Sequence, residues 1–384
     1  MRTGTLGDHV RHRQSALVHA VQPSVWRSSV STFDMSRAGV AAPIRVSIAV
    51  GIVLVVSGLL GSRDVAGFAA LGAVTSAFCR PDPYRVRVGR LGVLGIGIVT
   101  AVGIGAALGL TDASITVQIA TISILGGCAA LLVGTLRMAG PGAIIFVFAA
   151  TGSMGFVDSA SDLRRTVIAT VIGTVCGAVA SLAPWLLRGT WSRIRPTQLR
   201  PITDNTPVQY ESLWTILTRR PRHELVANSL RIVVAMAASA AIATAAGLSH
   251  PMWAAMGAIA AMQGVSYHVT VQRGVQRLLG NVGGAIIAVV LLGLGINYWG
   301  AVLVIVICQL AAEITAPVNY AVASVAVTPM ALLLTGLSAD LPPSAALDRV
   351  MDTLIGVAVG IVVAALTITA PDVGRLRQPA KVST

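Results

Sequence analysis

The sequence has few charged residues, and acidic residues are the rarer of them. Charged residues make up 11% of the 384 residues, with 28 Lys and Arg against 15 Asp and Glu. Soluble domains carry about 25% charged residues, so this scarcity excludes an ordinary soluble domain. The basic residues stand mostly in short loops between apolar runs. There they report membrane topology and do not indicate a nucleic-acid partner.

The chain also lacks the motifs of common enzymes. No nucleophile stands at a usable spacing from a base, no residue cluster has metal-ligand spacing, and no glycine-rich loop suits a phosphate group. We therefore expect no enzyme, no cofactor and no metal. The cysteines have no ligand-like spacing, which favours small buried packing residues over a metal site or a disulfide. They are Cys79, Cys128, Cys176 and Cys308.

Long apolar runs dominate what is there, and hydrophobic residues make up 55% of the chain. A helix needs about 20 apolar residues to cross a bilayer, and the alternating pattern of a membrane barrel does not occur. We predict an all-α, polytopic helical membrane protein in the lipid bilayer, with about 12 transmembrane helices. The expected segments are 40–61, 65–79, 88–110, 113–136, 139–157, 165–187, 226–248, 251–265, 275–296, 298–313, 316–337 and 346–370.

The basic residues set the expected orientation. When the loops alternate between the two sides of the membrane, one side receives all the Lys and Arg except four. Basic residues favour the cytoplasmic side. We expect a multi-pass protein of the cell inner (plasma) membrane with both termini cytoplasmic. The four exceptions are Arg63, Arg164, Arg165 and Arg349.

The second half of the chain resembles the first. The string "AGFAALGAV" at 66–74 aligns with "PMWAAMGAI" at 251–259, and Arg45 aligns with Arg231. Each copy holds six segments, an even number, so the two copies keep one orientation and form parallel repeats.

These boundaries divide the chain into five parts. The expected parts are a cytoplasmic N-terminal tail 1–37, a first repeat 38–187, a cytoplasmic linker 188–225, a second repeat 226–370 and a cytoplasmic C-terminal tail 371–384. We expect the N-terminal tail to contain no signal peptide and to be partly disordered or to lie on the membrane surface. Residues "YESLWTILTRR" of the linker are compatible with a surface helix.

Arginines inside apolar segments have two interpretations. Arg45 and Arg231 stand at equivalent positions in the first helix of each repeat. Each either extends to the interface as an anchor or faces a cavity and binds a carboxylate. Arg273 and Arg277 precede a glycine-rich run, where topology anchoring competes with attraction of an anion to the helix N-terminus.

The sparse acidic residues suggest ion pairs or proton transfer. Glu313 aligns with Arg137, which predicts a Glu313–Arg137 ion pair near the cytoplasmic end, unless both are unrelated turn residues. Asp348 and Asp352 share a helix face, and Arg349 stands where it can pair with Asp352. Asp352 is a candidate proton carrier or part of a solvated helix end.

Several polar residues of the second half align with apolar residues of the first. This asymmetry suggests that the second half lines a path and the first half is a scaffold. His250 is placed for proton transfer, although an interfacial histidine without a role is the alternative. The polar residues concerned are His250, Gln263, Asn281, Asn319 and Asp352.

Three strings carry a family resemblance: "PMWA" at 251–254, "RLLGNVGG" at 277–284 and "RVMDTLIG" at 349–356. Their order and spacing resemble the fusaric acid resistance (FUSC) and aromatic acid exporter family, and weaker copies extend the likeness over most of 38–370. The resemblance implies an inner-membrane protein associated with efflux of aromatic carboxylic acids. Relatives of the broader group include plant anion channels. The positions carried over are Arg231, Trp253, Arg277, Asn281, Arg349, Asp352 and Gly356.

We therefore expect an exporter of small organic anions, with aromatic carboxylic acids as the expected class, driven by protons or by the membrane potential. An anion channel and a non-transporting scaffold for envelope-related partners are the alternatives, and a homo-oligomer is possible. The expected substrate-binding residues are Arg45, Arg231, Trp253, Arg277 and Asn281. The expected proton-coupling or ion-pair residues are Arg137, His250, Glu313 and Asp352.

Overall fold

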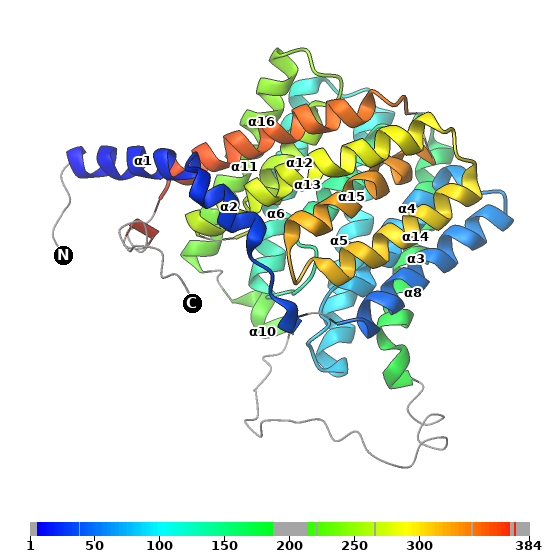
Figure 1. Cartoon of the computed structure of the whole chain (residues 1–384). Helices are drawn as coiled ribbons and strands as arrows, with labels where there is room; N and C mark the ends of the chain where they lie inside the picture. The colour runs from blue at the N-terminus through cyan, green and yellow to red at the C-terminus, as the bar shows by residue number, and fades with distance from the viewer. Residues whose placement is uncertain are drawn as a thin grey trace.

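The computed structural model describes residues 6–37, 39–186, 213–219, 222–264, 266–338, 341–368 and 372–373. Within these ranges all regular structure is helical, which confirms the predicted fold class of a polytopic helical protein (Figure 1). Eight of the helices described are long and apolar enough to cross a membrane. Four of the twelve predicted segments form shorter helices, so the expected number of transmembrane helices is not reached by length alone.

The first half contains six main helices, two of them short. The second of the six helices is flanked by the 3-10 turns η2 (Arg63–Val65) and η3 (Val74–Ala77). The six are α3 (Ala41–Leu59), α4 (Ala66–Ala73), α5 (Tyr84–Leu110), α6 (Ile115–Thr135), α7 (Ile144–Met154) and α8 (Ala160–Leu186).

The second half again contains six main helices, and local sequence sets their ends. Asn319 caps the fifth by accepting hydrogen bonds from Ala321 N and Val322 N, while Gly247 and Gly295, with positive φ, follow the first and third. The six are α11 (His223–Ala245), α12 (Pro251–Ala261), α13 (Tyr267–Gly293), α14 (Tyr298–Thr315), α15 (Tyr320–Gly336) and α16 (Ala345–Leu366).

The helices pack in the same order in both halves. The second helix of each half packs on the sixth, and the third packs on the fifth, as α4 with α8 and α12 with α16. Between the halves, α3 packs on α14 and α11 packs on α6. These parallels favour the repeat inferred from the sequence.

The short second helices lie in the centre of the bundle. Every residue of α4 is buried, and every residue of α12 except Pro251 is buried. Small residues permit this packing, since a methyl group added at Gly173 or Gly356 would overlap the carbonyl oxygen of Ala69 or Ala254. Longer helices shield α4 and α12 from lipid, so neither has to span the bilayer itself.

Contacts between loops define two ends of the bundle, which we call the distal and the proximal end. At the distal end, Arg165 of α8 binds Asp64, and Ser338 Oγ donates to the Asp64 carbonyl oxygen. At the proximal end, Cys79 N donates to the Ala139 carbonyl oxygen. Helices α3, α5, α7, α11, α13 and α15 begin at the proximal end, and the other six begin at the distal end.

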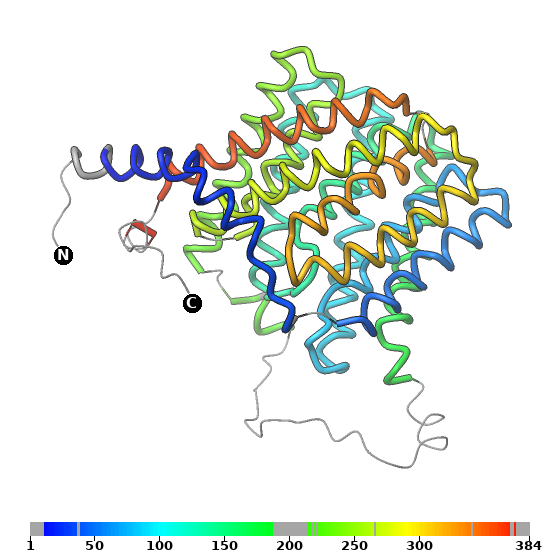
Figure 2. Tube along the Cα trace, viewed as in Figure 1, coloured from blue at the N-terminus to red at the C-terminus, as the bar shows by residue number. Residues whose placement is uncertain are grey.

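The N-terminal tail is more ordered than expected. Residues 6–37 form α1 (Leu6–Ala20), α2 (Pro23–Ser31) and the turn η1 (Met35–Arg37), and the first two helices lie on the second half (Figure 2). Gln276 Nε2 donates to Ser29 O, and Asn319 Nδ2 donates to Val30 O and Thr32 O. Polar side chains of α13 and α15 therefore bind the backbone of the tail.

Other boundaries need smaller corrections. Helix α11 begins at His223, inside the predicted linker 188–225, and α10 (Leu213–Thr218) forms part of the expected surface helix. Most of the linker and of the tail 371–384 lies outside the described residues. All four cysteines are free, but Cys128 is exposed and not a buried packing residue, because its side of α6 lies on the bundle surface.

Candidate functional site

A cavity of about 180 Å³ lies between the halves near the distal end. Its walls come from α4, α7, α12 and the end of α15. Phe68, Phe148, Phe156 and Trp253 supply aromatic surface, and Thr335 is one of few polar residues. An apolar cavity of about 150 Å³ holds benzene. The volume therefore suits one aromatic ring.

Trp253 connects the cavity to buried charge. The His250 ring stacks on the Trp253 ring with centroids 4.1 Å apart. The guanidinium carbon of Arg349 lies 4.9 Å from the centroid of the same ring, within the range of a cation–π contact. Arg349 is 3% exposed, although both His250 and Trp253 line the cavity. The tryptophan thus has an imidazole and a guanidinium as its neighbours.

Asn281 joins three helices beneath this stack. Its Nδ2 donates to the Arg349 carbonyl oxygen at 2.9 Å and to Thr353 Oγ1 at 2.8 Å. Its Oδ1 accepts from Thr328 Oγ1 at 2.8 Å. Because Asn281 is fully buried, these bonds fix α13 against α15 and α16.

The buried charges near Asn281 are only partly paired. Arg277 is 3% exposed and Asp352 is fully buried, and both influence Arg349 electrostatically. The expected Arg349–Asp352 ion pair is not made, and both carboxylate oxygens of Asp352 lack a hydrogen-bond partner. Arg349 thus lies near a second guanidinium and near a carboxylate that it does not bind, which leaves it able to bind an added anion.

His250 stands at the distal mouth of the cavity. Its Nδ1 lies 3.7 Å from Asp348 Oδ2. Burial lowers the pKa of His250 below its ordinary value, Asp348 acts in the opposite direction, and Arg349 lowers the pKa further. The imidazole is therefore neutral at pH 7.

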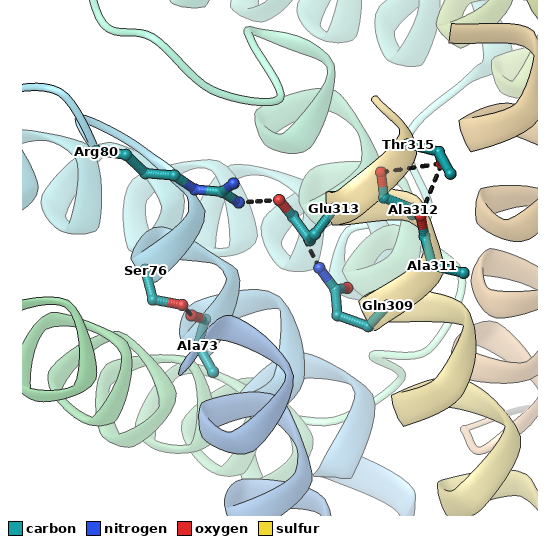
Figure 3. A network of polar contacts seen from close by, with 8 residues as sticks. All are labelled: Ala73, Ser76, Arg80, Gln309, Ala311, Ala312, Glu313 and Thr315. Atoms are coloured by element: carbon teal, nitrogen blue, oxygen red, sulfur yellow. Dashed lines mark hydrogen bonds and ion pairs between the residues drawn. The ribbon is translucent and has the colours of Figure 1, made fainter. Parts of the chain in front are cut away.

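At the proximal end Glu313 binds Arg80 and not Arg137, so the predicted Glu313–Arg137 pair is wrong in its partner (Figure 3). Arg137 is exposed in the turn after α6, where its positive φ directs the chain away. Gln309 Nε2 donates to Glu313 Oε1 at 2.9 Å. Burial, followed by the charge of Arg45, lowers the pKa of Arg80 to about 10, which leaves it charged.

A second contact closes the proximal end between the halves. Gln263 Nε2 donates to the Pro141 carbonyl oxygen at 3.0 Å, and Arg273 Nη1 donates to Gln263 Oε1 at 2.7 Å. Arg273 also lies over the Tyr320 ring. Arg273 therefore holds Gln263 in place for the contact that joins the two halves at the proximal end.

The remaining predicted arginines do not reach the cavity. Arg45 and Arg231 are half-buried near the proximal end and lie among different neighbours, since Arg80 is the charge near Arg45 and Asp372 the charge near Arg231. The structure thus brings His250, Trp253, Asn281 and Asp352 together with Arg277 and leaves Arg45, Arg137, Arg231 and Glu313 outside the group.

Three contributors have no clear signal in the sequence. Arg80 follows a turn in which Cys79 has positive φ, and nothing near it suggests a partner 233 residues away. Thr328 and Thr353 lie in ordinary apolar helices. Within the described ranges, no three His, Cys, Asp or Glu side chains gather as they would around a metal ion.

The comparison with family models identifies the half that holds this group. Residues 236–363 match the model described as fusaric acid resistance protein-like. This part of the chain is similar to that family. The comparisons with curated proteins and with solved structures gave no match.

The fusaric acid resistance protein-like segment confirms the resemblance seen in the sequence. It begins in α11, ends in α16 and contains the three strings that carried the resemblance. It also contains Trp253, Asn281, Arg349 and Asp352, whereas Arg231 lies just before it. The second-half wall of the cavity is therefore built from the family's own segment.

Proposed function

We propose that the protein exports small organic anions across the inner (plasma) membrane, with aromatic carboxylic acids as the preferred class. The family description supports an efflux role in general. The observation that carries the proposal is the cavity itself. It suits one aromatic ring, and the Trp253 ring in its wall contacts the buried cation Arg349. The aromatic ring of such a substrate can pack on Trp253, and its carboxylate can bind Arg349.

The electrostatics support an anion more than a cation. A charged side chain inside a membrane is expensive and generally marks a substrate or ion path. Arg277 and Arg349 supply two positive charges, and Asp348 and Asp352 are the carboxylates near them, so protonation of Asp352 leaves one positive charge in excess. An arriving carboxylate would neutralise this excess, provided that Trp253 moves aside to expose Arg349.

The proposed architecture is a pair of parallel six-helix repeats with both termini cytoplasmic. In that orientation the cavity lies toward the outside, and the Arg80–Glu313 and Gln263–Pro141 contacts close the cytoplasmic side. Export then requires these contacts to open so that the anion can enter from the cytoplasm.

Two driving forces fit this arrangement. An inside-negative potential drives an anion outward by about 2.3 kcal/mol per charge per 100 mV. Alternatively, Asp352 binds a proton during the cycle, because its buried oxygens have no hydrogen-bond partner in the closed form. An anion channel would use the potential alone.

The test measures flux of labelled benzoate in proteoliposomes at varied pH and membrane potential. We expect saturable flux that benzoate analogues inhibit and that a ring compound without a carboxylate does not. Replacing the charge by Arg349→Gln should reduce flux by about tenfold or more, because a charge-assisted bond contributes about 1.5–3 kcal/mol. Arg137→Gln, at an exposed turn, is the matched control and should keep native flux.

The outcomes separate the alternatives. Flux that follows pH and weakens in Asp352→Asn supports proton coupling, while current that follows voltage alone supports the channel. Absence of benzoate flux from folded protein, or equal flux in Arg349→Gln, would refute the proposed function.

A further inference from the structure

Helices α3 and α14 lie side by side at the edge of the bundle (Figure 1). An apolar groove runs between them, away from the cavity. Its volume is about 480 Å³. Isoleucine and valine side chains of α3 form one wall, and Val306 and Leu310 of α14 form the other. Ile48 is 54% exposed and Ile52 is 50% exposed, so hydrocarbon can reach the groove from the side.

The other crossing between the halves, where α6 packs on α11, has no such space. There, methyl groups added at Gly126 and Gly127 would overlap Met236 and Val233. In the groove, Gly51 has only Val306 as a neighbour of its absent side chain. The open groove is thus a feature of α3 and α14 and does not follow from the general packing of the bundle.

Polar groups stand where the groove meets the membrane surface. Arg45 lies four residues after the start of α3, about 6 Å along the helix, which is the depth of lipid headgroups. It shares a helix face with Ile52 and Val56, which line the groove. Arg45 has no hydrogen-bond or ion-pair partner among the residues that the structure describes.

Ser47 supplies a second, independent observation. It lines the groove and is 4% exposed, yet its hydroxyl makes no hydrogen bond to any described residue. A buried hydroxyl without a partner is unfavourable. An acceptor that enters the groove, such as an ester carbonyl oxygen, would satisfy it.

We propose that this groove binds an anionic phospholipid. One acyl chain lies between α3 and α14, an ester carbonyl accepts from Ser47, and the phosphate group binds Arg45. Arg80, the neighbouring arginine, does not supply the positive charge for the phosphate group, because it is already bound to Glu313. The lipid headgroup therefore lies beside the contact that closes the proximal end.

Native mass spectrometry of the full chain in detergent tests the proposal, with titrated phosphatidylglycerol and phosphatidylcholine as probes. We expect phosphatidylglycerol to bind about fivefold more tightly, the effect of one arginine near an anionic headgroup. Arg45→Gln should abolish this preference, and Arg45→Lys should keep it. Val55→Trp, which fills the groove, should weaken both lipids.

The matched control is Ile124→Trp, a substitution at an exposed position of α6 that should bind both lipids like the native chain. Elution of each variant as a single species in gel filtration shows that it is folded. If folded Arg45→Gln keeps the preference, or if Val55→Trp binds lipid as Ile124→Trp does, the proposal is wrong. A free fatty acid that displaces phosphatidylglycerol at equal concentration would also overturn the assignment to a phospholipid.

Discussion

Asn281 is a fully buried polar side chain that joins α13 to α15 and α16. Asn281→Leu would remove its bonds to Thr328 and Thr353 and to the Arg349 carbonyl oxygen. Each buried polar group left without a partner costs about 1–3 kcal/mol. We expect a lower free energy of unfolding in a denaturing-detergent titration. Gln118→Leu, at a half-buried position with one hydrogen bond, should lower the free energy of unfolding less. Equal effects of the two substitutions would contradict the role of Asn281 in joining the helices.

The ionisation of His250 depends on charges from α16. The Asp348 carboxylate stabilises the imidazolium and so raises the pKa, against the larger effect of burial. Asp348→Asn should therefore lower the pKa of His250 further, and Arg349→Gln should raise it. Histidine NMR resonances followed against pH measure both shifts. A higher pKa in Asp348→Asn would show that the carboxylate does not face the ring, and Asp162→Asn is the control that should cause no change.

Individual residues show what could be inferred about the candidate site from the sequence. Trp253, Asn281 and Asp352 stood out because polar or aromatic groups are rare in apolar segments, and the structure places all three near the cavity or its supporting network. The partner of Glu313 was not predictable. Alignment of the repeats relates Glu313 to Arg137, but whether two aligned residues touch depends on which helix faces meet.

Helix α12 packs closely on α16 because each helix has a glycine at the contact, Gly257 in α12 and Gly356 in α16. A side chain at Gly356 would overlap the Ala254 carbonyl oxygen, whereas one at Gly293 meets no atom within 4 Å. Gly356→Val should separate the helices and reduce the yield of folded protein, and Gly293→Val should not. Gel filtration in detergent measures the folded fraction. Equal yields would mean that the two helices do not pack as the structure shows.

The Arg80–Glu313 contact joins the loop after η3 to the end of α14. If it must open during export, a bond across it should stop flux. Arg80→Cys/Glu313→Cys in a Cys79→Ala background should lose benzoate flux after thiol cross-linking and regain it on reduction. Flux that persists in fully cross-linked protein would show that the proximal end does not open there. The uncross-linked double variant controls for loss of the charges.

The helices were easier to predict than their roles. A helix overlaps each of the twelve predicted segments, because apolar runs bounded by turns are a strong signal. The bounds were less predictable, since α13 begins at Tyr267, eight residues before the predicted segment 275–296. Which helices are buried inside the bundle was not predictable. Helices α4 and α12 are apolar on all sides, and such a helix can face either lipid or protein. The contacts of the tail were not predictable for a related reason. The side chains of Gln276 and Asn319 hold α2 by donating hydrogen bonds to its carbonyl oxygens, and no hydropathy pattern reveals such bonds.

The whole bundle supports one account of transport. Two halves with the same packing order meet at short central helices, and the cavity lies where α4 and α7 face α12 and α15. The sequence suggested that the second half alone lines the path. The structure gives the first half an equal share of the wall, because Phe68, Phe148 and Phe156 all line the cavity.

Occupying the cavity with a side chain tests this account most directly. Gly152 lines the cavity, and a methyl group there would contact only Phe68, at 3.7 Å. The account predicts that Gly152→Phe abolishes benzoate flux in proteoliposomes while Gly152→Ala retains it. Native flux through folded Gly152→Phe protein would contradict the claim that the anion passes through this cavity.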